Sequence, residues 1–508
     1  MKKIRCIILS LSTLMMFKLN LSAQTTTQRL DSLFSALDHD HAFNGNVLIA
    51  ENGKIVYKRS MGFANFEQQK LNNDSSCFQI GSVSKTFTAV AVLQLQEKGK
   101  LKLEDTFVKY FPGFPYPAVT IYQLLTHTSG IPDKEELFFP IIEKQPDTIF
   151  SNQDIIPAIK ALKKPGAFTA GTQWRYCNMG YALLALLVEK VSKESFHDYL
   201  KQHIFLPAKM EHTYLLHPQI PSTNQVTGYL VRAHYLGDLE TINNSKKVHH
   251  WSYNMRGFEG PTNIVSTTGD LFNYDKALQN NMLLKPATIS KMLTPSHLLN
   301  ELPTQADGEF GRASYGIGWF LLNDSSAGKI VMHTGREPGF FSFYLRDLTH
   351  HRTIILIDNA ESSGFGKACK ESFNILSQTN YFPEIRYKQS LFLLYAKTLY
   401  TKGADPAITR FNLLKSDTAH YFTDERELNE LGLELLSDNH TEAALEALKL
   451  CTILYPESWN TYDSYGKALL QNGKKEEAIL MYQKSIEMNS NNEPAKKILE
   501  RIMHNLNL

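Results

Sequence analysis

Hydrophobic and polar residues alternate along two short segments near the start of the chain. Phe43 to Ala50 and Lys54 to Ser60 alternate well enough to predict β-strands. Glu51-Asn52-Gly53 lies between them and predicts a hairpin turn, because Asn and Gly both tolerate positive φ. An amphipathic helix is expected before the hairpin, over Thr27 to Leu37.

The middle of the chain loses this alternation, and three more strands are expected only after residue 325. Residues 100 to 325 read as mixed helices and loops. The clearest helices there are Tyr181 to Lys193 and Thr268 to Gln279. Before them, directly after Gly81, the apolar-rich run Ser82 to Lys98 predicts a buried helix. Strand-like runs and a closing helix then cover Lys329 to His333, Phe340 to Leu345, Arg352 to Asp358 and Gly366 to Leu376. Strands at both ends with helices between them predict an α/β (α+β) fold, in which both ends of the domain build one antiparallel sheet beside a helical subdomain.

From about residue 385 the pattern becomes continuously helical and repeats itself every 34 residues. Leu428, Leu431, Gly432, Leu435, Ala444, Leu448 and Pro456 are matched 34 positions later by Tyr462, Tyr465, Gly466, Leu469, Ala478, Tyr482 and Ser490. This spacing is typical of tetratricopeptide repeats, here 425–458 and 459–492. Stacked repeats need neighbours or caps, so a helical pair over Tyr387 to Lys415 and a capping helix over Pro494 to Asn505 are expected.

The first 23 residues read as a signal peptide. They have a basic start, an apolar run from Cys6 to Phe17, and a small residue, Ala23, before the cleavage point. A membrane anchor is the alternative, but Lys18 interrupts the apolar run before it reaches the length of a span. Cys6 lies inside that run, so no lipoprotein cysteine is expected. We therefore expect a periplasmic or secreted protein with no membrane span after cleavage.

Charge and cysteine content narrow the choice of partners further. The net charge is +2, and it falls to −2 without the four basic residues of the first 23, which argues against nucleic acid or an anionic membrane as partner. The 508 residues suffice for a large domain, 24–383, and a smaller helical region, 384–508. The remaining cysteines are few and widely spaced, so we expect buried free thiols at Cys77, Cys177, Cys369 and Cys451.

Ser82-Val83-Ser84-Lys85 is the first motif with chemical meaning. Residues i and i+3 of a helix share a face, so Lys85 can activate the Ser82 hydroxyl, which is a poor nucleophile by itself. The same pattern recurs at Ser326 to Lys329 and at Ser464 to Lys467. Only Ser82 follows a glycine at the start of a buried helix, where an oxyanion can be stabilised.

Two further motifs accompany it. Tyr176-Cys177-Asn178 is the chain's single Tyr-x-Asn; a phenol near cationic groups should have a lowered pKa and could serve as base or proton shuttle. His333-Thr334-Gly335 is the single such triplet, on a strand beside which a substrate could lie. The backbone N–H of Arg336 would then be a second oxyanion donor.

Together these motifs resemble the serine β-lactamase class C superfamily, which includes DD-carboxypeptidases, D-aminopeptidases and related esterases. The resemblance covers roughly residues 28 to 380 and extends to further stretches: Leu124 to Gly130, Gly171 to Tyr176, Ser266 to Leu271 and Tyr315 to Trp319. It implies a β-lactamase/transpeptidase-like fold and acyl transfer. Ser82 would form the acyl-enzyme, Lys85 and Tyr176 would move the protons, and Asn178 would position the acyl side chain.

The chain departs from class C β-lactamases at position 333, where those enzymes carry lysine. Histidine there is more typical of DD-peptidases, aminopeptidases and esterases, and its charge should depend on pH near neutrality. Cys177, where Ser or Ala is commoner, is expected only to pack. The side chain of Arg336 is a candidate clasp for a substrate carboxylate.

Neither a metal site nor a cofactor is expected. Asp38 to His41 is read as a polar loop, and Thr126 to Gly130 as a helix-terminating loop near the site. The leading expectation is an exported serine hydrolase acting on a peptide, amide or ester, with weak β-lactam binding or hydrolysis possible. The alternative is a non-catalytic module that binds peptidoglycan or protein. The repeats are expected to bind a protein partner or to self-associate.

Overall fold

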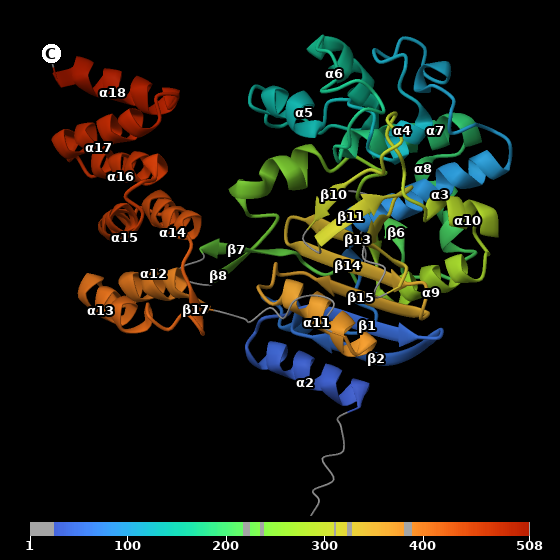
Figure 1. Cartoon of the computed structure of the whole chain (residues 1–508), viewed down its shortest axis with the longest axis horizontal. Coiled ribbons are helices and arrows are strands. Elements are labelled where there is room, and N and C mark those ends of the chain that lie inside the picture. The colour runs from blue at the N-terminus through green and yellow to red at the C-terminus, as the bar shows by residue number, and fades with distance from the viewer. Residues whose placement is uncertain are drawn as a thin grey trace, which may run out of the picture.

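The computed structural model describes residues 25–216, 224–233, 238–308, 311–322, 328–379 and 389–506. These form an α/β part, residues 25–379, and an all-helical array, residues 389–506, which lies to the left in Figure 1. The array has a buried cluster of its own, separate from the two clusters of the α/β part. The expected signal peptide and the boundary near residue 383 lie outside the described residues and stay predictions.

One eight-stranded sheet, antiparallel throughout, organises the α/β part. In spatial order its strands are β10 (Ala306–Gly308), β11 (Gly311–Tyr315), β12 (Phe320–Leu322), β13 (Ile330–Glu337), β14 (Phe340–Asp347), β15 (Arg352–Asp358), β1 (Gly45–Glu51) and β2 (Lys54–Met61). β1 pairs with β15, so strands from the two ends of the α/β part lie side by side in the sheet. The expected fold class is confirmed.

The predicted hairpin and its flanking helix are also confirmed. Asn52 and Gly53 turn the chain between β1 and β2 with φ of 52° and 73°, conformations that Asn and Gly adopt at low cost. The preceding helix, α2 (Thr26–His39), runs two residues beyond the expected end. Asp38 and His39 therefore belong to its last turn, where the expectation was a loop.

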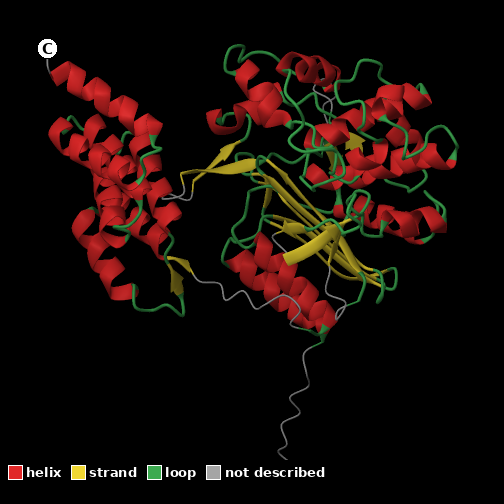
Figure 2. Ribbon diagram, turned by 45° about the horizontal axis from the view of Figure 1, so that its top comes forward, coloured by secondary structure: helices red, strands yellow, loops and turns green. Residues whose placement is uncertain are grey.

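Helices cover both faces of the sheet (Figure 2). On one face α2 and α11 (Phe365–Ser377) pack together, and Phe34 and Phe373 are buried against residues such as Phe343. On the other face lie α3 (Ser84–Glu97), α7 (Asn178–Ser192) and α9 (Thr268–Gln279), which bury an apolar cluster with Tyr344 and Ile355. The helices expected over these segments are confirmed.

The helical subdomain is completed by shorter elements. Its other helices are α4 (Ile121–Leu125), α5 (Lys134–Ile142), α6 (Ile155–Leu162), α8 (Phe196–Leu200) and α10 (Pro286–Met292). The small strands outside the main sheet are β3 (Phe63–Asn65), β4 (Lys70–Leu71), β5 (Phe78–Gln79), β6 (Tyr214–Leu215), β7 (Tyr229–Ala233), β8 (Asp238–Thr241) and β9 (Ile264–Ser266). The expected buried thiols are confirmed, since all four described cysteines are buried and form no disulfide.

The helical array consists of helical hairpins with the predicted period. Its elements are β16 (Gln389–Ser390), α12 (Leu391–Lys402), α13 (Ala404–Leu414), β17 (Tyr421–Phe422), α14 (Glu425–Ser437), α15 (Thr441–Leu454), α16 (Trp459–Gln471), α17 (Lys475–Met488) and α18 (Glu493–Leu506). The hairpins α14–α15 and α16–α17 start 34 residues apart. A Cβ on Gly432 would lie 2.5 Å from Leu448 Cγ, so the helices cross too closely for a side chain there. That these hairpins are tetratricopeptide repeats stays a prediction.

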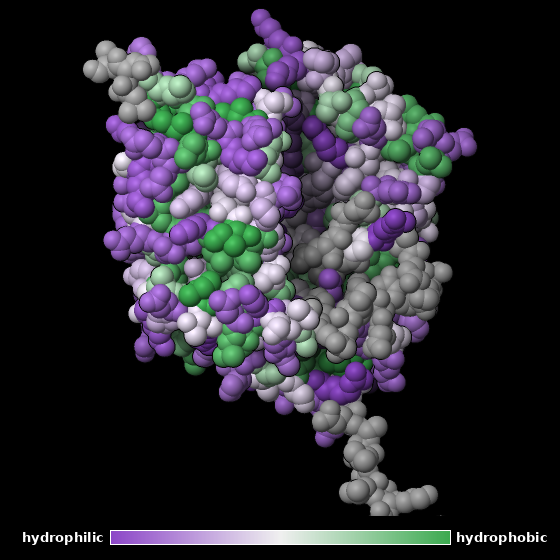
Figure 3. Space-filling view, turned by 60° about the vertical axis from the view of Figure 1, so that its left-hand side comes forward, coloured by the Kyte–Doolittle hydropathy of each residue, from purple (hydrophilic) through white to green (hydrophobic). Residues whose placement is uncertain are grey.

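The surface is mixed in character. Hydrophilic and hydrophobic residues are interspersed over the side seen in Figure 3, and a hollow runs down its middle. The two parts are in contact through an ion pair between Lys247 Nζ and Glu434 Oε1 of α14 at 3.1 Å. Among the described residues, no helix combines the length and the apolar character that crossing a membrane requires.

Candidate active site

Ser82 lies on a turn pressed against the sheet. The chain leaves β5, and Gly81, Ser82 and Val83 form one 3-10 turn before α3 begins at Ser84. Gly81 has a φ of 49°, and a Cβ there would lie 2.8 Å from the backbone nitrogen of Arg336. Glycine is therefore required at position 81, and the expected helix starts two residues after Ser82.

β13 is held against this turn by contacts at Gly335. A Cβ on Gly335 would lie 2.0 Å from the carbonyl oxygen of Ile80, and the hydroxyl of Ser342 donates to the same oxygen at 2.7 Å. Both contacts bring the backbone around Ser82 close to that of Arg336. This closeness is what two oxyanion donors at these positions need. Their role stays a prediction.

Lys85 is fully buried and has three hydrogen-bond partners. Its Nζ lies 2.9 Å from Ser82 Oγ, 2.9 Å from Asn178 Oδ1 and 3.1 Å from the carbonyl oxygen of Pro261. Amide and carbonyl oxygens can only accept, so two of these bonds use N–H groups of the lysine. A neutral amine has two N–H groups and one lone pair, and here the lone pair is left to face the serine hydroxyl.

Asp133 fixes the orientation of Asn178. Its carboxylate accepts from the backbone N–H of Asn178 at 3.0 Å and of Met179 at 3.0 Å, and from the Asn178 side-chain amide at 3.2 Å. The amide nitrogen therefore faces Asp133, which leaves Oδ1 for Lys85. This residue was missed in the sequence. In the sequence, the spacing of Asp133 and Glu136 matches a capping box and so predicts only that Asp133 caps α5, which it does. Nothing in that spacing indicates its contact with α7.

Burial determines the protonation of the two groups nearest Ser82. It lowers the pKa of Lys85 to about 7, with Lys134 lowering it further and Asp133 and Glu337 opposing the change. It raises the pKa of Tyr176 above its usual value, although a hydrogen bond with Ser82 pulls the other way. The expected lowering of the Tyr176 pKa is wrong, because the cost of burying a phenolate exceeds the effect of nearby cations.

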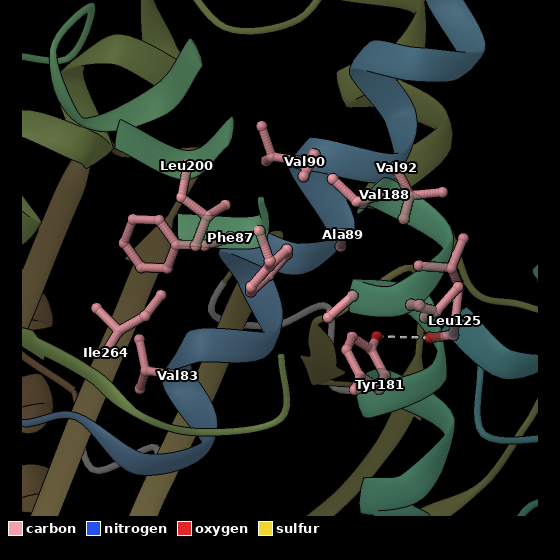
Figure 4. Close-up of a cluster of buried hydrophobic side chains, with 14 of the residues drawn as sticks. Val83, Phe87, Ala89, Val90, Val92, Leu125, Tyr181, Val188, Leu200 and Ile264 are labelled. Carbon is pink, nitrogen blue, oxygen red and sulfur yellow. Dashed lines mark hydrogen bonds between the residues drawn. The ribbon is translucent and has the colours of Figure 1, made fainter. Parts of the chain in front are cut away.

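Tyr176 stands in an aromatic wall beside Lys85. The Nζ of Lys85 lies 4.7 Å from its ring centroid, and the rings of His127 and Phe320 lie 4.3 Å and 6.4 Å from it. Figure 4 shows the packing behind this wall, where α3 and α7 interdigitate and the Tyr181 hydroxyl donates to Leu125 O at 2.7 Å. Lys85 is fully buried beside this wall, while Tyr176 is partly exposed.

His333 is buried and neutral. Its Nδ1 lies 2.7 Å from the carbonyl oxygen of Thr334, which can only accept, so Nδ1 carries the proton. Its Nε2 lies 3.3 Å from the Tyr315 hydroxyl and is left to accept. Burial and the charge of Lys85 lower the pKa of His333 to about 3. The expectation that its charge changes near neutral pH is therefore wrong.

The other residues of the third motif divide between the faces of the sheet. Thr334 and Arg336 are paired with Phe343 and Phe341 of β14, on the face covered by α2 and α11. The guanidinium of Arg336 lies 5.3 Å from the Phe341 ring centroid, so this exposed side chain is turned away from the turn that carries Ser82. Any contact of Arg336 with substrate there has to come from its backbone.

The loop after α4 supports the Tyr-x-Asn segment. His127, at a φ of 59°, is buried, and its Nδ1 accepts from the Cys177 backbone N–H at 3.1 Å. The expected helix-terminating loop is confirmed, and Cys177 is buried, as the packing role predicts. Of the other two Ser-x-x-Lys matches, Ser464 lies within α16, far along the chain in the helical array, while residue 326 lies outside the described residues. The described residues contain no group of three or more metal-ligating side chains.

A pocket of about 560 Å³ opens beside these groups. Asn178 and Pro261, which both bind Lys85, form part of its wall, and Phe340 and Met255 supply apolar lining. Its charged lining residues are Lys134, Arg256 and Glu337. The arrangement offers a buried base, a nucleophile and an adjoining space for a substrate group.

Comparison with known proteins agrees with this arrangement. The family model described as Beta-lactamase matches residues 30–372. The chain is 32% identical to Penicillin-binding protein 4* of Bacillus subtilis over 466 residues, which cover 90% of this chain and 99% of that protein. With 90% of the chain covered, the similarity continues beyond residue 372 into the helical array.

Solved structures share the fold. A penicillin-binding protein from Bacillus halodurans superposes with a TM-score of 0.56 at 26% identity, covering 68% of this chain and 97% of that one. D-amino acid amidase from Ochrobactrum anthropi gives 0.56 at 22% identity, covering 68% and 99%, and this likeness concerns the fold alone. From the family match, the relative at 32% identity and the site geometry, the chain belongs to the Beta-lactamase family and is a serine hydrolase of that family.

Proposed function

We propose that this protein is an exported hydrolase, related to the class C group of the family, that cleaves a peptide, amide or ester through an acyl-enzyme on Ser82. The observation that carries the proposal is the 2.9 Å contact between Ser82 Oγ and a fully buried Lys85 whose other two partners can only accept. Burial favours the neutral amine, which is the form that can remove a proton from serine.

In the acylation step, Ser82 Oγ forms a bond to the substrate carbonyl carbon while its proton passes to Lys85 Nζ. The backbone N–H groups of Ser82 and Arg336 receive the negative charge that develops on the carbonyl oxygen. The bond to the leaving group then breaks, and the proton moves from Lys85 to the leaving nitrogen or oxygen. Tyr176, kept protonated by burial, is suited to relay it.

Deacylation repeats these steps with water as the nucleophile. Lys85 takes a proton from the attacking water, the water oxygen bonds to the acyl carbon, and the proton returns to Ser82 Oγ as the ester bond breaks. Asn178 Oδ1 is bound to Lys85, and Asn178 also lines the pocket. Its position in the pocket wall is what supports a role in placing the acyl side chain. A D-amino-acid peptidase or esterase is favoured over a β-lactamase, because His333 replaces the lysine of the resembling class C enzymes.

The test measures covalent labelling and turnover together. Purified protein is incubated with a fluorescent penicillin, a fluorophosphonate, a panel of p-nitrophenyl esters and D-amino acid amides. Ser82→Ala should lose all labelling and all turnover. Ser464→Ala, which removes the serine of a matching motif in the helical array, should retain both. Wild-type rates in Ser82→Ala would refute the assignment, and no adduct of any probe by intact mass would favour the binding-module alternative.

The helical array is proposed to bind a protein partner or a second copy of the chain. Its own buried cluster supports a role separable from catalysis. A chain that ends near residue 383 should then keep the labelling rate of Ser82 and lose the partner. A loss of labelling would mean that the array instead supports the α/β part, with which it shares the Lys247–Glu434 ion pair.

A further inference from the structure

Two cations, Lys134 and Arg256, line the pocket beside Ser82 together with one carboxylate, Glu337, whose pKa Lys134 lowers against the effect of burial. Lys134 is the first residue of α5, and Arg256 follows the segment His250–Asn254. Within the described residues neither of them forms an ion pair. Both side chains are partly exposed, so a ligand in the pocket can reach them.

Aromatic rings hold both cations in place. The Nζ of Lys134 lies 3.7 Å from the ring centroid of Trp251, and the guanidinium carbon of Arg256 lies 4.7 Å from that of Tyr253. A cation on a ring face is positioned without being neutralised, and its N–H groups at the ring's edge stay available to an acceptor. The two side chains are therefore ordered beforehand for an anion.

The negative charge nearby does not cancel the two cations. Among the described residues that line the pocket, Glu337 is the sole carboxylate, and its pKa is raised by burial. Asp133, next to Lys134 in the chain, is already occupied by the N-terminal amides of α7. Glu135 is exposed and does not line the pocket. The lining therefore carries an excess of positive charge.

The rest of the polar lining suits a peptide-like group. A side-chain amide can both donate to and accept from a substrate amide. Several amides gather around the pocket: Gln79, Asn178, Gln225, Asn243 and Asn263. Phe340, Met255 and Phe258 provide apolar surface between them. Because Asn178 also binds Lys85, this lining is continuous with the reacting groups.

We propose that the pocket selects substrates whose acyl side carries a carboxylate, which Lys134 and Arg256 bind. The inference rests on the proposed function and names its substrate class: acidic peptides, or amides and esters of acyl groups that carry an acid. Glu337, at the end of β13, would disfavour a carboxylate placed near the strand and so direct it toward the two cations. An ammonium group captured by Glu337 is the opposite prediction, and the experiment separates the two.

The test uses three fluorophosphonate probes whose six-carbon chains end in a carboxylate, a carboxamide or an ammonium group. The second-order rate of Ser82 adduct formation is measured for each by intact mass. The carboxylate probe should react about 10- to 100-fold faster than the carboxamide probe, the range expected for a charge-assisted hydrogen bond. Lys134 also lowers the pKa of Lys85, so the variants are compared at pH 9, where Lys85 is neutral in each of them. There Lys134→Gln and Arg256→Gln should each reduce that ratio by lowering the carboxylate rate alone. Lys144→Gln, an exposed lysine after the end of α5, is the matched control and should leave the ratio unchanged.

The possible results distinguish the two proposals. Equal rates for the carboxylate and carboxamide probes, or the fastest rate for the ammonium probe, would overturn the inference and leave the Ser82 assignment intact. Absence of an adduct with all three probes would overturn the proposed function, and the inference with it. Because the carboxamide rate reports folding and nucleophile reactivity, a variant that fails to fold is recognised by loss of that rate as well.

Discussion

The protonation of Lys85 gives the sharpest quantitative prediction. Lowering its pKa from 10.5 to about 7 favours the neutral amine by about 5 kcal/mol. At pH 7 about half of the protein then carries a neutral Lys85, whereas an ordinary lysine would be neutral in about one molecule in 3,000. The reaction of Ser82 should therefore follow the fraction of neutral Lys85 across the physiological pH range.

The assay is the pH dependence of Ser82 labelling by a neutral fluorophosphonate, corrected for hydrolysis of the probe. The rate should rise about tenfold per pH unit between pH 5 and 6, bend near pH 7, and be constant from pH 8 to 9. A single bend is expected, because the pKa of His333 is lowered to about 3 and that of Tyr176 is raised. Arginine stays protonated, so Lys85→Arg should lower the plateau by about 10²- to 10⁴-fold.

Two results would refute this reasoning. A rate that is constant from pH 5 to 9 would mean that no group titrating in this range controls the nucleophile. A bend near pH 7 that persists in Lys85→Arg would assign it to another residue. Thermal unfolding of the variant provides the control, since a loss of labelling counts only if Lys85→Arg remains folded.

Three other changes have defined outcomes. Lys85→Met should stabilise the protein most below pH 7. Between about pH 7 and 10.5 the unfolded wild-type chain binds more protons than the folded one, so the free energy of unfolding of the wild type rises with pH and the advantage of the variant shrinks. Chemical denaturation of both proteins at pH 6 and pH 9 measures this difference. Asp133→Asn removes a charge that raises the Lys85 pKa, so the bend in the labelling profile should move to lower pH while the plateau falls about 10-fold or more. Asp275→Ala leaves Arg346, fully buried and 2.5 Å from that carboxylate, without its partner, and should lower the free energy of unfolding by about 3–5 kcal/mol in urea titrations.

The fold was predictable because its elements carry strong local patterns. The alternation on either side of Asn52-Gly53 and the apolar runs before and after residue 345 identify five strands of the sheet without knowledge of their partners. The three strands at the other end of the sheet, β10 to β12, were not predicted. β12 spans three residues and β11 five, which is too short for periodicity to separate strand from loop.

The site was predictable in its members and not in its protonation. Helix spacing predicted the contact of Ser82 with Lys85, and the family resemblance implied that Tyr176 and Asn178 join them; the structure places the four together. The states of Tyr176 and His333 were predicted wrongly. The Tyr176 prediction used nearby charge and the His333 prediction used the ordinary pKa of histidine, whereas burial, which cannot be read from neighbours in sequence, has the largest effect on both pKa values. Asp133 was missed for a related reason, since its two capped helices are distant in the chain.

The neutral state of His333 changes what that position can mean. Where class C enzymes carry lysine, His333 was expected to carry a charge that varies with pH. The buried imidazole instead donates to Thr334 O and accepts from the Tyr315 hydroxyl without ionising. A substrate therefore meets no cation at the head of this strand segment. The unpaired cations lie instead at Lys134 and Arg256 in the pocket wall. A substrate anion should accordingly bind on the acyl side of the scissile bond, and a ligand that needs a cation at position 333 should react slowly whatever the pH.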